Sequence, residues 1–221
     1  MPRIIDVLLS ILALLALLVL LPLFIPIIVI LLLTGEHKVF YLQTRVGYKN
    51  KDFKIIKFAT MLSNSANMGS GSLTLKNDPR VLPFGTFLRK TKINELPQIL
   101  NIIIGDLSIV GPRPQMQVDF EKYSDDVQQK IYNVRPGLTG IGSIIFRDEE
   151  SLISFAAENE NPHDFYKRVI APYKGELEIW YHLHRSVFLD SQLIFMTAWA
   201  IVSPETRLYE KWFKDLPKRS F

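Results

Sequence analysis

Residues 7–33 read VLLSILALLALLVLLPLFIPIIVILLL, 27 consecutive residues without a charged side chain. As a helix this run would be about 40 Å long, whereas the apolar core of a bilayer is about 30 Å thick. A cleaved signal peptide has a shorter apolar region followed by a small-residue cleavage site, and no such site is visible here. The run therefore predicts a membrane segment.

Two prolines, Pro22 and Pro26, lie near the middle of the run and leave its path through the membrane open. Each removes a backbone donor and crowds the carbonyl four residues earlier, but proline is tolerated in spanning helices. Basic residues between His37 and Lys57 place the next part of the chain in the cytoplasm by the positive-inside rule. Length and flanks alone favour a plain single span over a helix that enters, breaks and returns to the same face.

The rest of the chain, residues 37–221, has the composition of a slightly basic globular domain, with 25 basic and 20 acidic side chains. The 221-residue chain has no cysteine, which excludes a disulfide scaffold, a thiolate metal site and a cysteine nucleophile. It also lacks the GxSxG, P-loop and GxGxxG motifs of serine hydrolases, P-loop nucleotidases and dinucleotide folds. Its basic groups do not alternate with aromatic residues, so we expect no nucleic-acid partner. A small positive excess beside a membrane segment fits anionic head groups and phosphorylated substrates better.

Local patterns predict an α+β fold that is mainly helical. Two β-prone runs at 39–42 and 53–58 flank a polar turn at 47–52, which predicts a small β-hairpin within residues 38–61. Residues 63–77 predict a loop that is either a mobile lid or a slack connection. The uncharged stretch 191–204 is too short to span a membrane. It is either a core helix or an interfacial helix, for which Trp199 and Trp212 would suit head-group depth.

The segment Asn94-Glu95-Leu96-Pro97 has the pattern of a helix start. Asn94 suits the N-cap, and Pro97 is tolerated in the first turn. Glu95 would then lie at the positive end of the helix dipole, which favours an ionised carboxylate. The residues that follow predict an apolar face and a glycine that ends the helix: Ile99, Leu100, Ile103, Ile104 and Gly105.

Two arginines are held by prolines. In Gly111-Pro112-Arg113-Pro114 both prolines have fixed φ angles and the residues before them are restricted, so the guanidinium is well placed to clamp a phosphate. Arg135-Pro136-Gly137 repeats the arrangement, with a glycine that permits close approach of the backbone. Asp78 and Asp106 add carboxylates that could hold Mg²⁺, which prefers one or two carboxylates together with phosphate oxygens.

An ordered set of motifs covers nearly the whole chain, from about residue 4 to about residue 200. After the apolar amino terminus with its central proline, the set comprises Gln43-Thr44-Arg45-Val46-Gly47, Lys57-Phe58-Ala59-Thr60-Met61, Asn77-Asp78-Pro79-Arg80, Leu88-Arg89-Lys90-Thr91, Asn94-Glu95-Leu96-Pro97-Gln98, residues 105–114 and residues 135–140. Together these motifs resemble the bacterial sugar transferase family, the monotopic phosphoglycosyl transferases.

This resemblance implies a transfer of sugar 1-phosphate from a UDP-sugar to undecaprenyl phosphate, with Mg²⁺ as cofactor and release of UMP. The product would be a polyprenyl diphosphate sugar, the first membrane-bound intermediate of a glycoconjugate such as an exopolysaccharide, lipopolysaccharide or capsule. The implied location is the bacterial inner membrane, with membrane lipids as further partners. The identity of the sugar and the formation of a homodimer stay open.

The resemblance also implies an organisation of the chain. Residues 1–36 would form a re-entrant (helix-break-helix) membrane helix, and residues 37–221 a catalytic domain on the cytoplasmic face with several amphipathic, interfacial helices. Family members break the membrane helix at a Ser-Pro pair. Here Ile25-Pro26 takes that place, with Pro22 in addition, and both prolines are the expected membrane break.

Asn94 departs from the family pattern, which is an Asp-Glu pair whose aspartate is thought to attack the donor phosphate covalently. An amide cannot do so, whereas a carboxylate can. Glu95 could take over the covalent role, or serve a direct displacement as base or Mg²⁺ ligand, or the protein could be inactive. The alternatives from other classes are a scaffold that binds lipid phosphate and a bitopic glycosyltransferase that releases UDP.

The expected site contains carboxylates and cations. Glu95 and Asp106 would serve the metal ion and the attack, with Asn94 beside them and Asp78 as a further metal ligand. Four cations would neutralise the diphosphate and its transition-state charge: Lys57, Arg89, Arg113 and Arg135.

Overall fold

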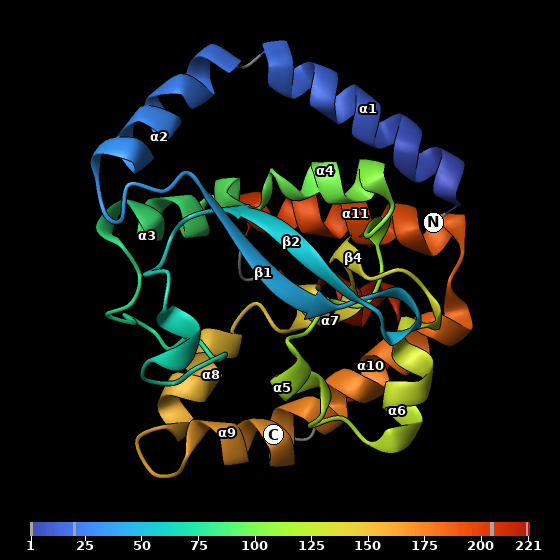
Figure 1. The fold of residues 1–221 in the computed structure, drawn as a ribbon. Helices are drawn as coiled ribbons and strands as arrows, with labels where there is room; N and C mark the ends of the chain where they lie inside the picture. The colour runs from blue at the N-terminus through green and yellow to red at the C-terminus, as the bar shows by residue number, and fades with distance from the viewer. Residues whose placement is uncertain (1, 20, 204–205, 220) are drawn as a thin grey trace.

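The computed structural model describes residues 2–19, 21–203, 206–219 and 221 (Figure 1). The fold is α+β and mainly helical, as the sequence predicts, with two sheets of two strands each in the described part of the chain. In chain order the elements are α1 (Arg3–Val19), α2 (Leu21–Leu33), β1 (Phe40–Val46), η1 (Tyr48–Asn50), β2 (Asp52–Phe58), η2 (Ser65–Asn67), α3 (Pro83–Lys90), η3 (Ile93–Glu95), α4 (Gln98–Ile104), β3 (Ser108–Val110), α5 (Gln117–Phe120), α6 (Asp125–Lys130), η4 (Ile131–Asn133), β4 (Gly137–Thr139), α7 (Ile141–Ile145), α8 (Glu149–Ala156), α9 (Pro162–Phe165), η5 (Tyr166–Ile170), α10 (Ala171–His184), α11 (Val187–Val202) and α12 (Leu208–Trp212).

The apolar run forms α1 and α2, which arch over α4 and α11 in Figure 1. No single helix among the described residues is long and apolar enough to cross a membrane. Arg3–Val19 and Phe24–Leu33 reach that length and composition only together, with a bend of 77° between them. Pro22 lies in the first turn of α2, next to the bend, whereas Pro26 lies inside α2 without ending it.

The first turn of α1 is tied to α4 and β3. Arg3 donates to the carbonyls of Ile102 and Ile103, the latter at 2.7 Å, and so satisfies free carbonyls at the carboxyl end of α4. The buried Asp6 accepts from the Ser108 hydroxyl at 2.8 Å and from a backbone N–H of β3 at 3.0 Å. The polar residues at the start of the apolar run therefore bind the domain that follows it.

The other end of the α1–α2 arch is attached to the same body. Leu31 is buried in a cluster with Phe58 of β2 and Leu88 of α3. Just beyond α2, the carboxylate of Glu36 accepts from the backbone N–H of Ser63 at 2.7 Å. Both ends of the arch thus contact one domain.

The predicted hairpin is confirmed. β1 and β2 pair antiparallel, with Phe40 opposite Phe58 and Val46 opposite Asp52. The second pair of strands, β3 and β4, is parallel and was not among the predicted elements; in it Ser108 lies opposite Gly137. A Cβ atom on Gly137 would come within 2.1 Å of the Gly111 nitrogen, so only glycine allows this close approach of the two backbones.

The prediction that Asn94 caps the helix is wrong. The chain turns through Lys92 in the left-handed region (φ 62°) into η3, and α4 starts only after Pro97. Asn94 lies buried inside η3 and caps nothing. Gly105, with φ 111°, ends the helix as predicted.

The predicted apolar face of α4 is correct only in part. Ile99 is buried, but Leu100 and Ile104 are exposed. A polar residue points inward instead, because the side chain of Asn101 bonds to the backbone of β2, donating to the Lys54 carbonyl at 2.8 Å and accepting from the Ile56 N–H at 3.0 Å. Hydrogen bonding to a strand therefore decides which face of α4 is buried.

For residues 191–203 the structure supports the core-helix alternative on one face of α11. Leu193 and Met196 are buried in the main core, whereas Phe195 and Trp199 are exposed and stack on one another. One face of the helix is thus core and another is apolar surface. Pro204, the last residue of the predicted stretch, lies outside the described residues.

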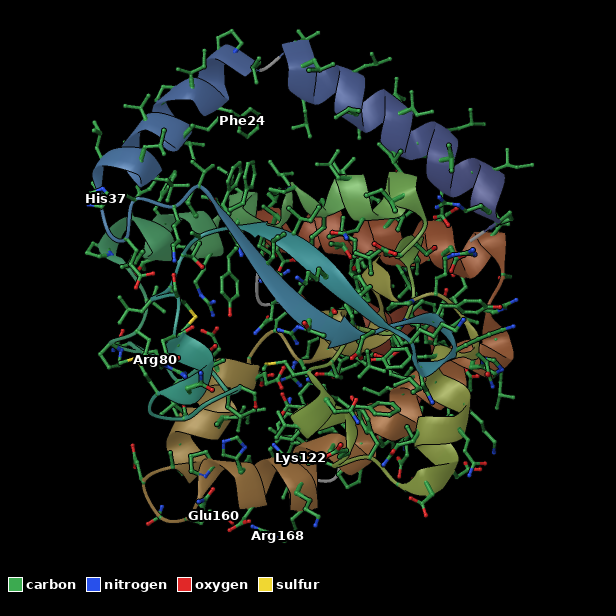
Figure 2. All side chains as sticks on the ribbon, in the orientation of Figure 1. Phe24, His37, Arg80, Lys122, Glu160 and Arg168 are labelled. Carbon is green, nitrogen blue, oxygen red and sulfur yellow. The ribbon has the colours of Figure 1, made fainter. Side chains whose placement is uncertain are left out.

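The loop at residues 63–77 is wrapped around a single buried side chain, Arg80 (Figure 2). The Arg80 guanidinium donates to the carbonyls of Ser65, Met68 and Gly71 at 2.7–2.8 Å. It is also paired with Asp78, which accepts from the Arg80 Nε at 2.8 Å. Hydrogen bonds to the buried Arg80 therefore hold the loop in place. The loop is not the slack connection that was one of the two alternatives from the sequence.

Candidate active site

Three segments far apart in the sequence meet at Glu95, the last residue of η3. Lys57 of β2 places its Nζ 3.8 Å from the Glu95 Oε1, and Arg113 of the loop after β3 places its Nη2 3.7 Å from the same atom. The Glu95 side chain is 17% exposed, so the carboxylate is largely buried but still reached by solvent. Glu95, Lys57 and Arg113 were all predicted site residues, and the fold brings them together.

Glu95 is ionised at neutral pH. Burial by itself would raise the pKa of its carboxyl group, but the positive charges of Lys57, Arg113, Lys92 and Arg89 outweigh burial and lower the pKa to about 2. A carboxylate this firmly ionised can act as a nucleophile or as a metal ligand without first losing a proton.

Lys57 is the group whose charge is most easily changed. Burial lowers the pKa of its amine to about 7; Glu95 opposes this shift, and Arg113, Arg45 and Arg89 add to it. An anion bound in the cluster would favour the charged amine and raise this pKa again. Arg113 behaves differently, since burial opposes its charge but Glu95 outweighs burial and raises the pKa of the guanidinium.

The cluster carries more positive than negative charge. Arg89 contributes from α3 and pairs with the exposed Glu150, while its Nη1 lies 3.7 Å from the Met61 sulfur. Lys92 contributes as well, and burial lowers its pKa although Glu95 opposes the shift. One carboxylate facing several cations leaves a positive potential that suits an anion with more than one charge, such as a diphosphate.

Asn94, beside Glu95 in η3, is 6% exposed, and its side-chain oxygen has no hydrogen-bond partner among the described residues. A buried acceptor without a partner is costly, so this oxygen is suited to a substrate hydroxyl or a metal ion. The amide oxygen of Asn94 and the carboxylate of Glu95 are both hard donors of the kind that Mg²⁺ prefers.

The fold does not bring the other two predicted metal ligands to Glu95. Asp78 is held by Arg80, whose hydrogen bonds lower the pKa of the carboxyl group. Asp106 lies beyond the opposite end of α4 and accepts from the Asn101 amide at 3.3 Å. In the part of the chain that the structure describes, no three His, Asp or Glu side chains are grouped to hold a metal ion.

Arg135 is also placed apart from the cluster. The turn after β3 folds back beside the segment before β4, where the Gly137 N–H donates to the Pro112 carbonyl at 2.8 Å, but the two guanidinium groups have different partners. The Arg135 Nε donates to the Gly105 carbonyl at 2.9 Å, and the guanidinium lies over the ring of Tyr48 at 5.3 Å. Its contacts support the end of α4 and the hairpin turn.

Two cations near the site were not predicted as site residues. Lys92 follows no motif that would have singled it out, and its effect on Glu95 depends on the left-handed turn before η3. Arg45 stands in one of the family motifs; it donates to the Pro114 carbonyl at 3.3 Å and so supports the loop that carries Arg113. Burial lowers the pKa of Arg45 to about 10, which leaves it charged at neutral pH.

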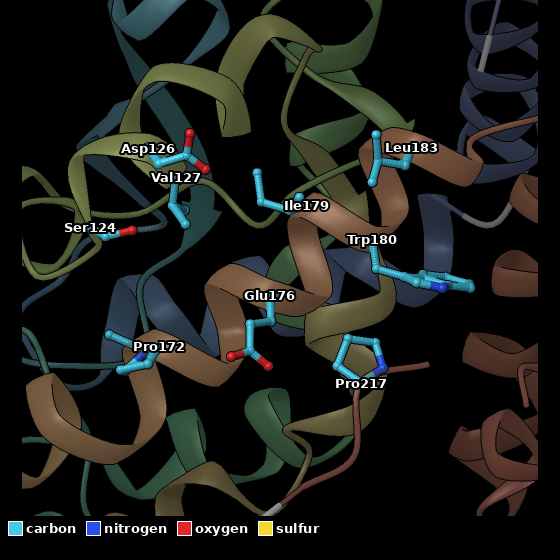
Figure 3. Close-up of a pocket in the computed structure, with 10 residues that line it drawn as sticks. Ser124, Asp126, Val127, Pro172, Glu176, Ile179, Trp180, Leu183 and Pro217 are labelled. Carbon is cyan, nitrogen blue, oxygen red and sulfur yellow. The ribbon is translucent and has the colours of Figure 1, made fainter. Parts of the chain in front are cut away.

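A cavity of about 630 Å³ lies elsewhere, between α6, α10 and the carboxyl-terminal segment (Figure 3). Asp126, Glu176, Trp180 and Pro217 are among the residues that line it. None of the predicted site residues lines this cavity. The convergence of charge at Glu95, and not the volume of this cavity, therefore marks the candidate site.

Comparison with known proteins agrees with the motifs. The family model of bacterial sugar transferases matches residues 1–204. The chain is 31% identical over 182 residues to a UDP-N-acetylgalactosamine-undecaprenyl-phosphate N-acetylgalactosaminephosphotransferase of Aeromonas hydrophila, which covers 79% of this chain and 38% of that protein.

Two further relatives differ in length. A UDP-glucose:undecaprenyl-phosphate glucose-1-phosphate transferase of Xanthomonas campestris pv. campestris is 32% identical over 177 residues, covering 79% of this chain and 34% of that protein. The exopolysaccharide production protein ExoY of Sinorhizobium fredii is 39% identical over 163 residues, covering 67% of this chain and 70% of that protein. The matched part of this chain thus spans little more than a third of the Aeromonas and Xanthomonas proteins and most of the Sinorhizobium one.

Proposed function

The chain belongs to the bacterial sugar transferase family, and we propose that it transfers a sugar 1-phosphate from a UDP-sugar to undecaprenyl phosphate and releases UMP. The observation that carries this proposal is the ionised Glu95 between Lys57 and Arg113, in a cluster with an excess of positive charge. A donor diphosphate supplies the missing negative charge, and a lipid phosphate supplies more. The reaction would be an early membrane step in the synthesis of a surface glycan.

Arg113 and Lys57 bind the donor diphosphate and stabilise the charge that develops on it, with Arg89 contributing from α3. Glu95 then acts in one of two ways. Its carboxylate attacks the phosphorus that bears the sugar, so that a carboxyl–phosphorus bond forms while the bond to UMP breaks, and the lipid phosphate displaces Glu95 afterwards. Otherwise the lipid phosphate attacks that phosphorus directly, with Glu95 as base or metal ligand.

Mg²⁺ is part of the proposal. Glu95 and the amide oxygen of Asn94 are the residues that would hold it, together with phosphate oxygens of the donor. The ion would supply charge neutralisation on the diphosphate. Asp78 and Asp106 are engaged elsewhere in the fold and have no part in this assignment.

The attachment of the α1–α2 arch supports a re-entrant path through the membrane. Arg3 and Asp6 at one end and Glu36 at the other all bind the same domain. A segment that crossed the bilayer would carry Arg3 and Asp6 to the side away from that domain. The arch therefore enters and returns on one face, the cytoplasmic face by the positive-inside rule, and presents the site to lipid phosphates there.

Single cysteines test the path of the arch, because the chain has no native thiol. Pro2→Cys and Thr34→Cys bracket the arch, and Thr34 is exposed, whereas a side chain at Gly35 would meet Leu82. We expect a membrane-impermeant maleimide to label both positions from the cytoplasmic face of oriented vesicles. Labelling of the two positions from opposite faces would contradict the re-entrant form.

The activity is tested with the purified full chain, undecaprenyl phosphate, Mg²⁺ and a panel of UDP-sugars. Release of UMP is expected with at least one sugar. Release of UDP instead would indicate a glycosyltransferase, and binding of lipid phosphate without any nucleotide release would indicate a scaffold. Exchange of labelled UMP into the UDP-sugar without lipid acceptor would identify the covalent path through Glu95, and turnover without such exchange would identify direct displacement.

A further inference from the structure

One buried carboxyl group outside the Glu95 cluster has no evident structural task. Glu178 lies within α10, is 3% exposed, and its Oε2 has no hydrogen-bond partner among the described residues. Space for it depends on Gly142 of α7, since a Cβ atom there would come within 2.4 Å of the Glu178 Oε1. An acidic side chain in the core, given room by a glycine, needs a physical reason.

The group that Glu178 serves is the backbone of Arg113. The Glu178 carboxyl group accepts the backbone N–H of Arg113. The carbonyl of the same residue accepts from the Tyr132 hydroxyl at 2.8 Å, and Tyr132 is fully buried. Both polar backbone atoms of Arg113 are thus bound by buried side chains, in a segment where prolines on either side already restrict the dihedral angles.

We infer that Glu178 is a positioning residue, which fixes the backbone of Arg113 so that its guanidinium reaches Glu95 and the donor diphosphate. The inference rests on the proposed function, because it assumes that Arg113 binds the donor. Glu178 itself is buried and touches no substrate in this assignment. Tyr132 binds the carbonyl of the same residue and contributes to the same positioning.

The charge state of Glu178 suits this role. Burial raises the pKa of its carboxyl group to about 8, although Lys174, the Arg113 N–H and the Arg113 charge act against burial. The remaining titratable groups near it are the hydroxyls of Tyr123, Tyr132 and Tyr181, whose pKa values Glu178 helps to raise. At neutral pH the group is a neutral acid, which accepts the N–H through its carbonyl oxygen and leaves the positive charge of Arg113 to Glu95 and to phosphate.

Two substitutions of Glu178 separate hydrogen bonding from charge. Glu178→Gln keeps a neutral acceptor, so kcat/KM for the UDP-sugar at pH 7 is expected within about threefold of the wild type. Glu178→Leu removes the acceptor and leaves a buried donor unpaired, so kcat/KM is expected to fall at least about tenfold. Gly142→Ala should cause a similar loss, because it leaves Glu178 chemically intact but displaces its carboxyl group.

Trp180→Phe is the matched control. Trp180 is on the same helix, two residues away and hence on the opposite side, and its indole N–H donates to Asp215 at 3.0 Å. The substitution also removes a hydrogen bond of a buried side chain but does not touch Arg113. Its kcat/KM is expected to stay close to that of the wild type.

A pH series supplies a readout that a purely structural role would not move. Ionisation of Glu178 above pH 8 places a negative charge beside Arg113, so the ratio of wild-type to Glu178→Gln activity should fall between pH 7 and pH 9. Titration of Lys57 occurs in both proteins and cancels in the ratio. Tyr132→Phe, with the other backbone contact removed, should raise KM for the donor several-fold at all pH values.

The outcomes distinguish the inference from the function on which it rests. A wild-type protein that releases no UMP with any donor contradicts the proposed function. An active wild type with Glu178→Leu and Gly142→Ala no worse than Trp180→Phe contradicts the positioning role. If circular dichroism shows that Glu178→Leu does not fold, the ratio of wild-type to Glu178→Gln activity decides. A ratio that stays constant from pH 7 to pH 9, together with normal kinetics of Tyr132→Phe, overturns the inference.

Discussion

Arg113 and Arg135 are alike in sequence and different in the structure. Each stands next to proline and close to glycine, and each lies beside the same parallel pair of strands, β3 and β4. The guanidinium of Arg113 faces the Glu95 carboxylate, whereas that of Arg135 is bound to the Gly105 carbonyl and the ring of Tyr48. Proline restricts the backbone in both cases, but the segments packed around each guanidinium decide what the side chain contacts.

The partners of the two arginines lie at opposite ends of helix α4. Its amino end follows Glu95, which faces Lys57 and Arg113. Its carboxyl end is covered by Arg3, on the carbonyls of Ile102 and Ile103, and by Arg135 on Gly105. Cations at the carboxyl end of a helix satisfy free carbonyls and its negative dipole end. The arginines at that end therefore stabilise the fold, whereas Arg113 at the other end faces Glu95 and, in the proposed function, binds the donor.

The largest effect is expected at the catalytic end. Glu95→Gln keeps the shape of the side chain but removes the charge that either path requires, so UMP release should fall at least about 10⁴-fold, as is typical for loss of one member of a catalytic unit. Turnover is measured as UMP formed from UDP-sugar and undecaprenyl phosphate. Glu150→Gln is the control, since Glu150 pairs with Arg89 at the exposed rim, and it should retain most activity. Full activity of Glu95→Gln would remove this carboxylate from the chemistry.

The next effect separates charge from geometry at Arg113. Arg113→Met should lower kcat/KM for the donor by about 10²- to 10³-fold, the range observed when one donor to a developing negative charge is lost. Arg113→Lys keeps the charge but loses the planar fork and should recover only part of this. Near-normal kinetics of Arg113→Met would show that Arg113, like Arg135, is not needed for activity.

Lys57 should make activity and stability depend on pH in opposite directions. Burial lowers its pKa to about 7, so kcat/KM, which reports the free enzyme, should fall by about tenfold as pH rises through that value and the amine loses its charge. Folding shows the reverse trend. Between pH 7 and about 10.4, Lys57 is protonated in the unfolded chain but neutral in the folded one. The free energy of unfolding should therefore rise with pH in this range.

Lys57→Met removes both trends and serves as the reference. The difference in unfolding free energy between wild type and Lys57→Met, followed by denaturant titration at several pH values, isolates this one group. A difference that stays constant from pH 7 to pH 9 would show that the lysine keeps an ordinary pKa. In that case the fall of kcat/KM above pH 7 must come from the titration of another group.

The motifs predicted which residues meet at the site better than they predicted its surroundings. Glu95, Lys57 and Arg113 could be identified because short motifs carry them and a diphosphate needs such groups. The β-hairpin followed from β-prone runs about a polar turn, and Gly105 ended its helix as expected. These features depend on local sequence, which is why a single chain suffices to predict them.

The failures involve contacts between distant segments. Asn94 was expected to cap α4, but the left-handed turn at Lys92 places it inside η3, and α4 starts three residues later than expected. Asn101 points inward only because β2 lies beside it. The different partners of Arg135 and Arg113 depend on α4, the hairpin turn and η3, which lie far from both arginines in the sequence. Local patterns carry no information on such contacts.

The smallest effect on activity, and the most direct test of the comparison, is expected at Arg135. Arg135→Met should leave kcat/KM within about threefold of the wild type while lowering the free energy of unfolding by about 1–3 kcal/mol, because the Gly105 carbonyl loses a charged donor. Arg113→Met should show the reverse pattern, a large kinetic loss with little change in the unfolding midpoint. The two proteins are compared by urea titration and by UMP release under identical conditions. A kinetic loss at Arg135 as large as that at Arg113, without loss of stability, would mean that the donor reaches both ends of α4 and that the division between a catalytic and a structural end does not hold.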